Sequence, residues 1–295
     1  EMLQHDRQIR QIRKALVKKV LDSLEEMKEK ESEKYLALWK AFGRVLKEGP
    51  SEDYENKDKL AELLLFSSSN DAEKLTSLSE YVSRMKDGQD AVYFSTGSSR
   101  AAIEASPHLE AFRGKGIEVL YMTDPVDELL AQALPEYQGK KLQSVGKGTV
   151  DLGTGEEKEE KKKELDEKTR ELQGLLERVQ KALEDRVKEV RLSSRLTASP
   201  ACLVGAEHDF SPRLEELLRR DTDRPRQRRI LELNPDHQIV NRLESLLEKE
   251  PESDRLAEYS ELLYGYALLA EGSELPDPAA FARRIAELMS RGLTS

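Results

Sequence analysis

The first part of the chain has the hydrophobic period of amphipathic helices. Apolar residues recur every three or four positions, and lysines and arginines occupy many positions between them. This stripe comprises Ile9, Ile12, Leu16, Val20, Leu24 and Met27. A second helical pattern follows through EKYLALWKAFGRVL, where we expect Trp39 and Phe42 to be core aromatics. EGPSEDYEN predicts a break before KDKLAELLLF resumes a helix.

From residue 78 the pattern becomes that of an α/β unit. The short apolar runs DAVYFST and IEVLYM alternate with helical patterns, SSRAAIEASPHLEAFRGKG and DPVDELLAQAL, and KKLQSV is a third candidate strand. Strands that alternate with helices predict a small parallel-type sheet with right-handed crossovers. The glycine-rich and then charged stretch GKGTVDLGTGEEKEEKKKE predicts a boundary near residue 152.

The remainder of the chain predicts a domain that ends in helices. VKEVRLS, ACLVG and ILELN have the pattern of three short strands. DHQIVNRLESLLEKE, SDRLAEYSELLYGYALLAEG and PAAFARRIAELMSRGL have the pattern of helices. We therefore expect a helix-rich α+β or α/β protein with three segments, residues 1–77, 78–152 and 153–295.

Composition agrees with this fold and limits the function. Of the 295 residues, 36% are charged and 37% are hydrophobic, as in helices with one buried stripe. The net charge of −10 argues against a nucleic-acid partner, which would need clustered Lys and Arg. The one cysteine, Cys202, is expected to be a buried strand residue, and it favours a reducing compartment such as the cytoplasm. No apolar run is long enough to span a membrane, so we expect no membrane partner.

One loop resembles the start of a phosphate-binding site. STGSSRAA joins a predicted strand to a predicted helix, but it has one glycine and lacks the lysine of a Walker-type loop. We favour the interpretation that Ser98 or Ser99 caps the helix, and an enzyme for a phosphate ligand remains an alternative. The four histidines show no zinc-binding spacing, so no metal site is expected.

Two apolar seams near the end of the chain predict a homodimer. The seam residues step by three or four on either side of the turn GSELPDP: Leu256, Tyr259, Leu263, Tyr266, Phe281, Ile285 and Leu288. Two such hairpins around a twofold axis can form a closed four-helix bundle. Burial contributes about 1.5–3 kcal/mol for each large apolar side chain, so the bundle can offset the cost of association. The alternative is a hairpin packed on its own sheet.

DFSPRLEELLRR predicts a short helix with one apolar face. That face comprises Phe210, Leu214, Leu217 and Leu218. If this face is exposed, it forms an apolar patch that can bind other proteins. If it is buried, it packs in the hydrophobic core. The pattern alone leaves both interpretations open.

Several stretches together resemble one family. LTSLSEYVSRMKDGQDAVYFSTG, SPHLEAFRGKGIEVLYMTDPVDE, GKKLQSV, LELNPDH and LLYGYALLAEG are similar to the ninety-kilodalton heat-shock chaperones, most nearly the bacterial HtpG form. The resemblance runs from Glu1 to about Leu293. It implies the end of the middle domain and the C-terminal dimerisation domain of a cytoplasmic, ATP-dependent chaperone. The domain that binds ATP and Mg would be absent, so we expect no cofactor and no ATPase activity in this chain.

The resemblance also assigns roles to single residues. Gln4 matches the glutamine of the family's catalytic loop, whose arginine has no counterpart here. Lys18 matches a surface that contacts the seventy-kilodalton heat-shock chaperone. The residues that match a site for partly folded client proteins are Leu129, Phe210, Leu214, Leu217 and Leu218, and the seam residues match the family's four-helix bundle. Leu129 stands where some members carry tryptophan. The rival interpretation is a structural dimer scaffold without a client site.

Overall fold

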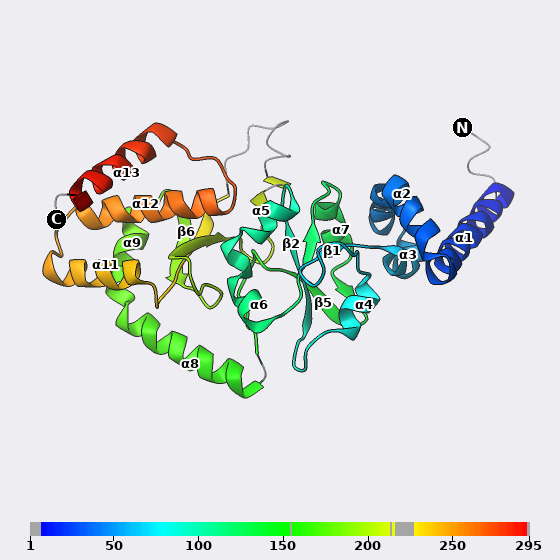
Figure 1. Cartoon of the computed structure of the whole chain (residues 1–295), viewed down its shortest axis with the longest axis horizontal. Helices are drawn as coiled ribbons and strands as arrows, with labels where there is room; N and C mark the ends of the chain where they lie inside the picture. Colours follow the sequence, from blue (N-terminus) through cyan, green and yellow to red (C-terminus); the bar gives the residue numbers. More distant parts are fainter. Residues whose placement is uncertain (1–6, 154, 213, 216–226, 294–295) are drawn as a thin grey trace. The chain divides into compact units, whose positions relative to one another are not determined.

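The chain forms two compact units in a computed structural model that describes residues 7–153, 155–212, 214–215 and 227–293 (Figure 1). The first unit comprises residues 1–85, 90–92 and 120–142, and the second comprises residues 86–89, 93–119 and 143–295. Both contain helices and strands, which agrees with the expected helix-rich α+β class. The expected division into three segments stays a prediction.

The helices of the first unit precede and follow its strands. They are α1 (Arg7–Lys30), α2 (Ser32–Glu52), η2 (Tyr54–Asn56), α3 (Lys57–Leu63), α4 (Leu78–Ser83) and α7 (Asp127–Ala133). The strands are β1 (Ser67–Ser68), β2 (Ala91–Thr96), β3 (Leu120–Met122), β4 (Glu136–Tyr137) and β5 (Lys140–Ser144), and residues 93–96 of β2 and 143–144 of β5 belong to the second unit. Together they make a sheet of order β1-β3-β2-β5-β4.

The three strands expected in this region are confirmed, but the expected parallel arrangement is not complete. DAVYFST, IEVLYM and KKLQSV correspond to β2, β3 and β5. The two edge strands, β1 and β4, were not expected, and each pairs antiparallel, β1 with β3 and β4 with β5. Strands of two residues are too short to show a hydrophobic period, so the sequence pattern could not reveal them.

The apolar stripe of α1 is buried only toward the end of the helix. Ile9, Ile12, Leu16 and Val20 are exposed, whereas Leu24 and Met27 are half-buried. The helix packs against α2 and α3 within its unit, and Leu21 is its most buried apolar residue. Described residues of α2 and α3 therefore cover the second half of α1 and leave the first half open.

Helix α2 confirms one of the two expected core aromatics. Trp39 is buried, but Phe42 is 58% exposed, so its expected place in the core is wrong. The helix continues into the expected break and includes Pro50 before it ends at Glu52, and a new helix begins at Lys57, as expected. Gly49 leaves room for Leu60 of α3, because a Cβ there would lie 2.9 Å from the end of that leucine side chain.

The second unit contains the remaining elements. Its helices are α5 (Arg100–Glu104), η3 (Pro107–Leu109), α6 (Glu110–Lys115), α8 (Gly155–Glu171), α9 (Gln173–Ala182), α11 (Gln238–Lys249), α12 (Arg255–Ala270) and α13 (Pro278–Leu293). Its sheet is β6 (Val187–Leu192), β8 (Arg229–Leu233) and β7 (Ala201–Val204), in that order. The pair β6 and β8 is parallel and the pair β7 and β8 is antiparallel. All three strands were expected from the sequence.

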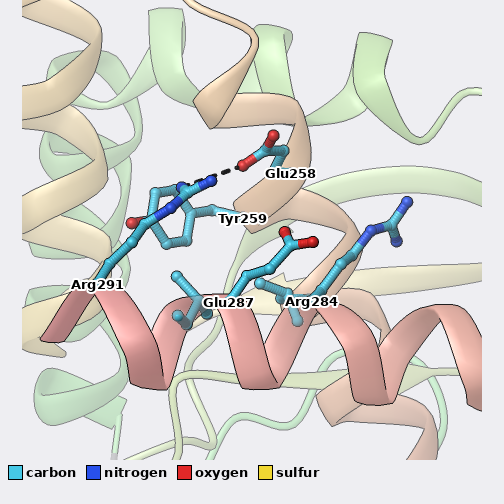
Figure 2. Close-up of a pocket in the computed structure, with 7 residues that line it drawn as sticks. Glu258, Tyr259, Arg284, Glu287 and Arg291 are labelled. Carbon is cyan, nitrogen blue, oxygen red and sulfur yellow. Dashed lines mark ion pairs between the residues drawn. The ribbon is translucent and has the colours of Figure 1, made fainter. Parts of the chain in front are cut away.

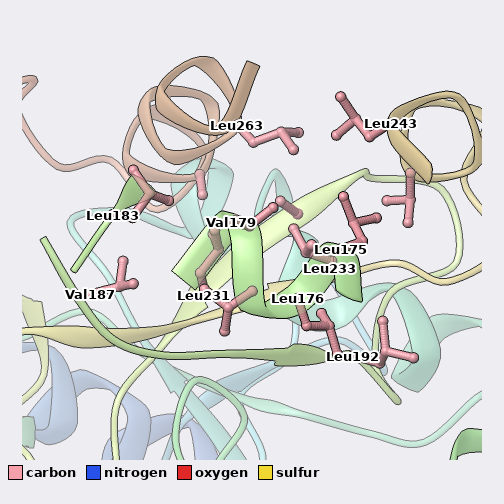
Figure 3. Packing of buried hydrophobic residues seen from close by; sticks show 14 of the residues in the cluster. Leu175, Leu176, Val179, Leu183, Val187, Leu192, Leu231, Leu233, Leu243 and Leu263 are labelled. Atoms are coloured by element: carbon pink, nitrogen blue, oxygen red, sulfur yellow. The ribbon is translucent and has the colours of Figure 1, made fainter. Parts of the chain in front are cut away.

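The core of the second unit lies between this sheet and three helices (Figure 3). Leu175 and Val179 of α9 point toward Leu231 and Leu233 of β8, while Leu263 of α12 contributes from another side. Helix α12 packs on both β7 and α9. Residues from α12 that were expected in an intermolecular seam thus also build the protomer's own core.

Candidate functional site

The loop that resembles a phosphate site is a helix cap. Ser99 Oγ accepts a hydrogen bond from the backbone amide of Ala102 at 3.1 Å, as an N-cap residue does. A Cβ on Gly97 would lie 2.6 Å from Cγ1 of Ile103, so this glycine serves close packing of the turn on α5. The helix has five residues. The capping interpretation from the sequence is therefore confirmed.

Possible metal ligands lie scattered among the described residues. Across the described parts of the chain, no cluster of three or more His, Cys, Asp and Glu residues could hold a metal ion. The one residue matched to the family's catalytic loop, Gln4, lies outside the described residues.

The expected client segment begins with an exposed aromatic ring and continues into a buried turn. Phe210 is 37% exposed, whereas Leu214 is 9% exposed and Ser211 is buried. The Ser211 side chain accepts a hydrogen bond from the Leu214 amide at 3.1 Å, and its carbonyl accepts one from Glu215 at 2.9 Å. Leu217 and Leu218 lie outside the described residues. In this structure Phe210 is accessible to a partner and Leu214 is not.

Leu129, the other client candidate, is exposed on α7 in the first unit. Its side chain is 52% exposed. Helix α7 is fixed to α2 by Lys47, whose Nζ lies 2.8 Å from Asp127 Oδ1 and 2.9 Å from Asp124 Oδ2. Lys47 and Asp127 are both buried, so this is a strong positional constraint. Leu129 is thus presented to solvent from a firmly anchored helix.

The expected dimer seam divides into buried and exposed residues. Leu256 and Leu263 are 5% exposed and belong to the protomer's core, as the alternative interpretation of the hairpin proposed. Tyr259, Phe281 and Leu288 are half-buried. Tyr266 and Ile285 are exposed. Only part of the predicted seam is therefore available to a second protomer.

The structure adds apolar residues that the seam pattern missed. Leu269 on α12 and Met289 and Leu293 on α13 are 52%, 64% and 87% exposed. Leu269 follows Tyr266 by three positions and Met289 follows Ile285 by four, so the same helical step along the sequence could have identified them. These residues enlarge the apolar surface of the two terminal helices.

Charged side chains surround a shallow hollow between α12 and α13 (Figure 2). Arg291 of α13 lies 3.5 Å from Glu258 of α12, and Arg284 lies 3.6 Å from Glu261. Tyr259 and Leu288 line the hollow. Exposed ion pairs of this kind contribute little to stability, so apolar contacts determine how α13 packs on α12.

A buried polar cluster in the second unit was not expected from the sequence. Arg195 is fully buried, with Nε donating to Glu232 Oε2 at 2.9 Å and Nη2 donating to the Gly148 carbonyl at 2.5 Å. Burial would raise the pKa of Glu232, but the guanidinium groups of Arg195 and Arg191 outweigh it and lower that pKa. The cluster therefore holds an ionised carboxylate inside the protein.

Cys202 and His108 lie close to this cluster. Cys202 is buried in β7, as expected, and burial raises the pKa of its thiol. His108 Nε2 lies 2.8 Å from the Leu203 carbonyl. Burial and, next, the charge of Arg195 lower the pKa of His108 to about 4, so the ring is neutral near pH 7.

Lys18, the residue matched to a chaperone contact, is exposed on α1.

The Hsp90 protein family model matches residues 1–295. The chain belongs to the Hsp90 family. Relatives named "Chaperone protein HtpG" are similar to it along almost its whole length. The protein of Geobacter sulfurreducens is 53% identical over 291 residues, covering 98% of this chain and 45% of the relative. That of Frankia casuarinae is 49% identical over 294 residues, covering 99% and 45%.

The family resemblance of the sequence is thus confirmed. A third relative, from Rhodococcus jostii, is 49% identical and also covers 99% of the chain, but only 46% of its own length is matched. The chain spans less than half the length of these Hsp90-family relatives. Among the described helices, none combines the length and apolar character needed to cross a bilayer.

Proposed function

We propose that this chain provides dimerisation and client binding in a homodimeric, ATP-dependent chaperone of the Hsp90 family. The observation that carries the proposal is the apolar surface of the two terminal helices, with Tyr266, Leu269, Ile285 and Met289 all exposed. Exposed apolar surface of this kind marks a protein interface, and a second copy of the same helices would cover it with like residues.

Client binding is proposed for Phe210 and Leu129. Each is a large apolar side chain that is accessible on a fixed backbone. Partly folded proteins expose apolar segments of many shapes, and such segments bind weakly to accessible apolar side chains. Leu217 and Leu218 remain proposed client residues on the family match. Leu214 is proposed to contribute when it becomes accessible, since it is buried in this structure.

ATP hydrolysis is proposed to require the parts of the longer relatives that this chain does not cover. We expect the chain alone to have no specific ATPase activity, and Gln4 to act only together with a nucleotide-binding domain. The protein is proposed to work in the cytoplasm. Lys18, exposed on a helix rich in basic residues, is proposed to contact the seventy-kilodalton heat-shock chaperone.

The test is suppression of heat aggregation of a model client, followed by light scattering, with Phe210→Glu compared with the parent. Phe210 is preferred to Leu214 because a glutamate at a buried position would disrupt the fold for reasons unrelated to clients. Phe42→Glu is the matched control, since Phe42 is also an exposed phenylalanine but lies on α2. Sedimentation should show the same oligomeric state for all three proteins.

Suppression that is weakened by Phe210→Glu and retained by Phe42→Glu would support the client site. Equal suppression by all three proteins would reject Phe210 as a client residue. No suppression by a dimeric parent would favour the rival function, a structural dimer scaffold.

A further inference from the structure

The segment that carries Phe210 and Leu214 is held by a buried carboxylate. Glu215 has a side chain that is 11% exposed, and its Oε1 accepts a hydrogen bond from the Gln227 amide at 2.7 Å. The Gln227 side chain in turn accepts one from the Phe210 amide at 3.1 Å. Glu215 and Gln227 lie on either side of residues 216–226 in the sequence. These two hydrogen bonds therefore connect Gln227 both to Glu215 and to Phe210.

The same carboxylate is paired with an arginine of the sheet. Arg229 of β8 donates from Nη2 to Glu215 Oε2 at 3.0 Å and from Nη1 to Glu271 Oε2 at 2.8 Å. Glu271 directly follows α12, and Ser273 donates to its other oxygen at 2.5 Å. One guanidinium thus joins the segment, the central strand of the sheet and the end of α12.

Within the described residues, this cluster has one cation and two carboxylates. Arg229 carries one positive charge and faces two carboxylates, and its own side chain is 11% exposed. Burial raises the pKa of Glu271 above its usual value, against the opposing effect of Arg229. Arg229 would still have Glu271 as a partner if its contact to Glu215 broke.

We propose that Glu215 and Arg229 form a latch that keeps Leu214 buried, and that opening the latch exposes Leu214 as additional apolar surface beside Phe210. Leu214 and Glu215 are neighbours in one turn, so a carboxylate that leaves Arg229 removes one of the restraints on the adjacent leucine. The latch connects this turn to α12, which carries Tyr266 and Leu269. The consequence for clients rests on the proposed function, whereas the latch itself does not.

The first test measures how often the turn opens. Leu214→Cys is combined with Glu215→Gln, which keeps the shape and the carbonyl acceptor but removes the charge that pairs with Arg229. Labelling of the introduced thiol is expected to be about tenfold faster than in Leu214→Cys alone, because a charge-assisted hydrogen bond is about twice as strong as a neutral one. Glu207→Gln is the matched control, since it removes an exposed carboxylate from the same loop region.

Cys202 provides an internal control in the same molecule. It is buried in β7 and is labelled only when the sheet opens. Faster labelling of the thiol introduced at position 214, with unchanged labelling of Cys202, would support the latch. An equal rise at both thiols would mean general unfolding and would overturn it, as would unchanged labelling of the introduced thiol.

Hydrogen exchange gives a second measurement without the cysteine substitution. The amides of Leu214 and Glu215 both donate to Ser211, and they should exchange faster in Glu215→Gln while the amides of β7 do not change. Equal exchange in parent and variant would overturn the latch.

The effect on clients is measured separately. Glu215→Gln should suppress client aggregation more strongly than the parent, and Glu207→Gln should not. An open latch with no gain in suppression would support the latch and reject the proposed client role of Leu214.

Discussion

Arg195 Nε donates to Glu232 Oε2 across 2.9 Å, and the two side chains are 0% and 3% exposed. Arg195 also donates to the carbonyls of Val145 and Gly148, which lie outside the sheet of Glu232. Within the second unit, one buried guanidinium therefore joins the end of β5 to β6 and β8. The pair acts as a structural connection between segments far apart in the sequence.

Removal of this arginine should strongly destabilise the protein. We expect Arg195→Met to lower the free energy of unfolding by about 3–5 kcal/mol, since it leaves a buried carboxylate without its closest cation. Arg191→Met should cost less, about 1–2 kcal/mol, because Arg191 is 24% exposed although it also binds Glu232. Urea unfolding followed by circular dichroism measures both. Equal losses would contradict a special role for Arg195.

The buried His108 should make the protein less stable in mild acid. Its pKa is about 4 in the folded protein and 6.5 as the ordinary value, so the unfolded chain binds a proton first as the pH falls. The stability that the neutral His108 ring contributes is fully present above pH 6.5. It is lost progressively as the pH falls toward 4, which lowers the free energy of unfolding by about 3 kcal/mol in total. Urea unfolding at several pH values between about 7.5 and 4 measures this loss.

His108→Gln isolates the contribution of the ring. Glutamine can still donate to the Leu203 carbonyl, but it does not titrate. The difference in unfolding free energy between the parent and this variant should shrink as the pH falls through this window. A difference that stays constant with pH would show that other groups cause the acid sensitivity.

These polar residues mark the limit of what the sequence could predict. The strands β6, β7 and β8 were predicted because each is a short apolar run whose signal is local. Arg195 and Glu232 are 37 positions apart, and charged residues are usually exposed, so nothing local reveals that they meet in the interior. The pairing exists only after β6 and β8 have come together.

The apolar stripes show a related limit. Periodicity identified α1, α12 and α13 as helices, but it could not say which neighbour covers each stripe. Ile12 and Leu16 follow the helical period and remain exposed, whereas Leu256 and Leu263 follow it and are buried in their own protomer. The helical period shows that one face of a helix is apolar, but the element that covers this face depends on tertiary packing.

The exposed apolar residues of the terminal helices should hold the dimer together. We expect Leu269→Glu combined with Met289→Glu to weaken the dimer by about 100-fold in Kd, since each substitution occurs twice in a symmetric interface and places charge in apolar surface. Sedimentation velocity over a range of concentrations measures this. Val45→Glu is the control, because Val45 is 61% exposed on α2.

Leu256 distinguishes the seam from the core. Because Leu256 is buried within the protomer, Leu256→Ala should lower the free energy of unfolding by about 2–5 kcal/mol and leave the folded protein dimeric. If the Leu269 and Met289 double variant stayed dimeric while Leu256→Ala dissociated, the buried rather than the exposed part of the hairpin would form the interface.

Gly265 determines how closely α13 approaches α12. A Cβ at this position would lie 2.5 Å from Cε2 and 2.6 Å from Cδ2 of Phe281, too close for an unmoved ring. Gly265→Ala gains about 1 kcal/mol in helix propensity, but the displaced ring must withdraw from the groove of α12 and carry the start of α13 with it. We therefore expect a lower melting temperature and a weaker dimer.

Gly114→Ala is the matched control for Gly265→Ala. Gly114 lies in α6, and a Cβ there would meet no atom within 4 Å, so the substitution should leave the melting temperature unchanged or raise it slightly. Thermal unfolding and sedimentation of both variants measure the two effects. Faster hydrogen exchange in α13 of Gly265→Ala would identify the loosened helix, because amides of a displaced helix open more often. If Gly265→Ala were as stable as Gly114→Ala and equally dimeric, the contact with Phe281 would not control the position of α13.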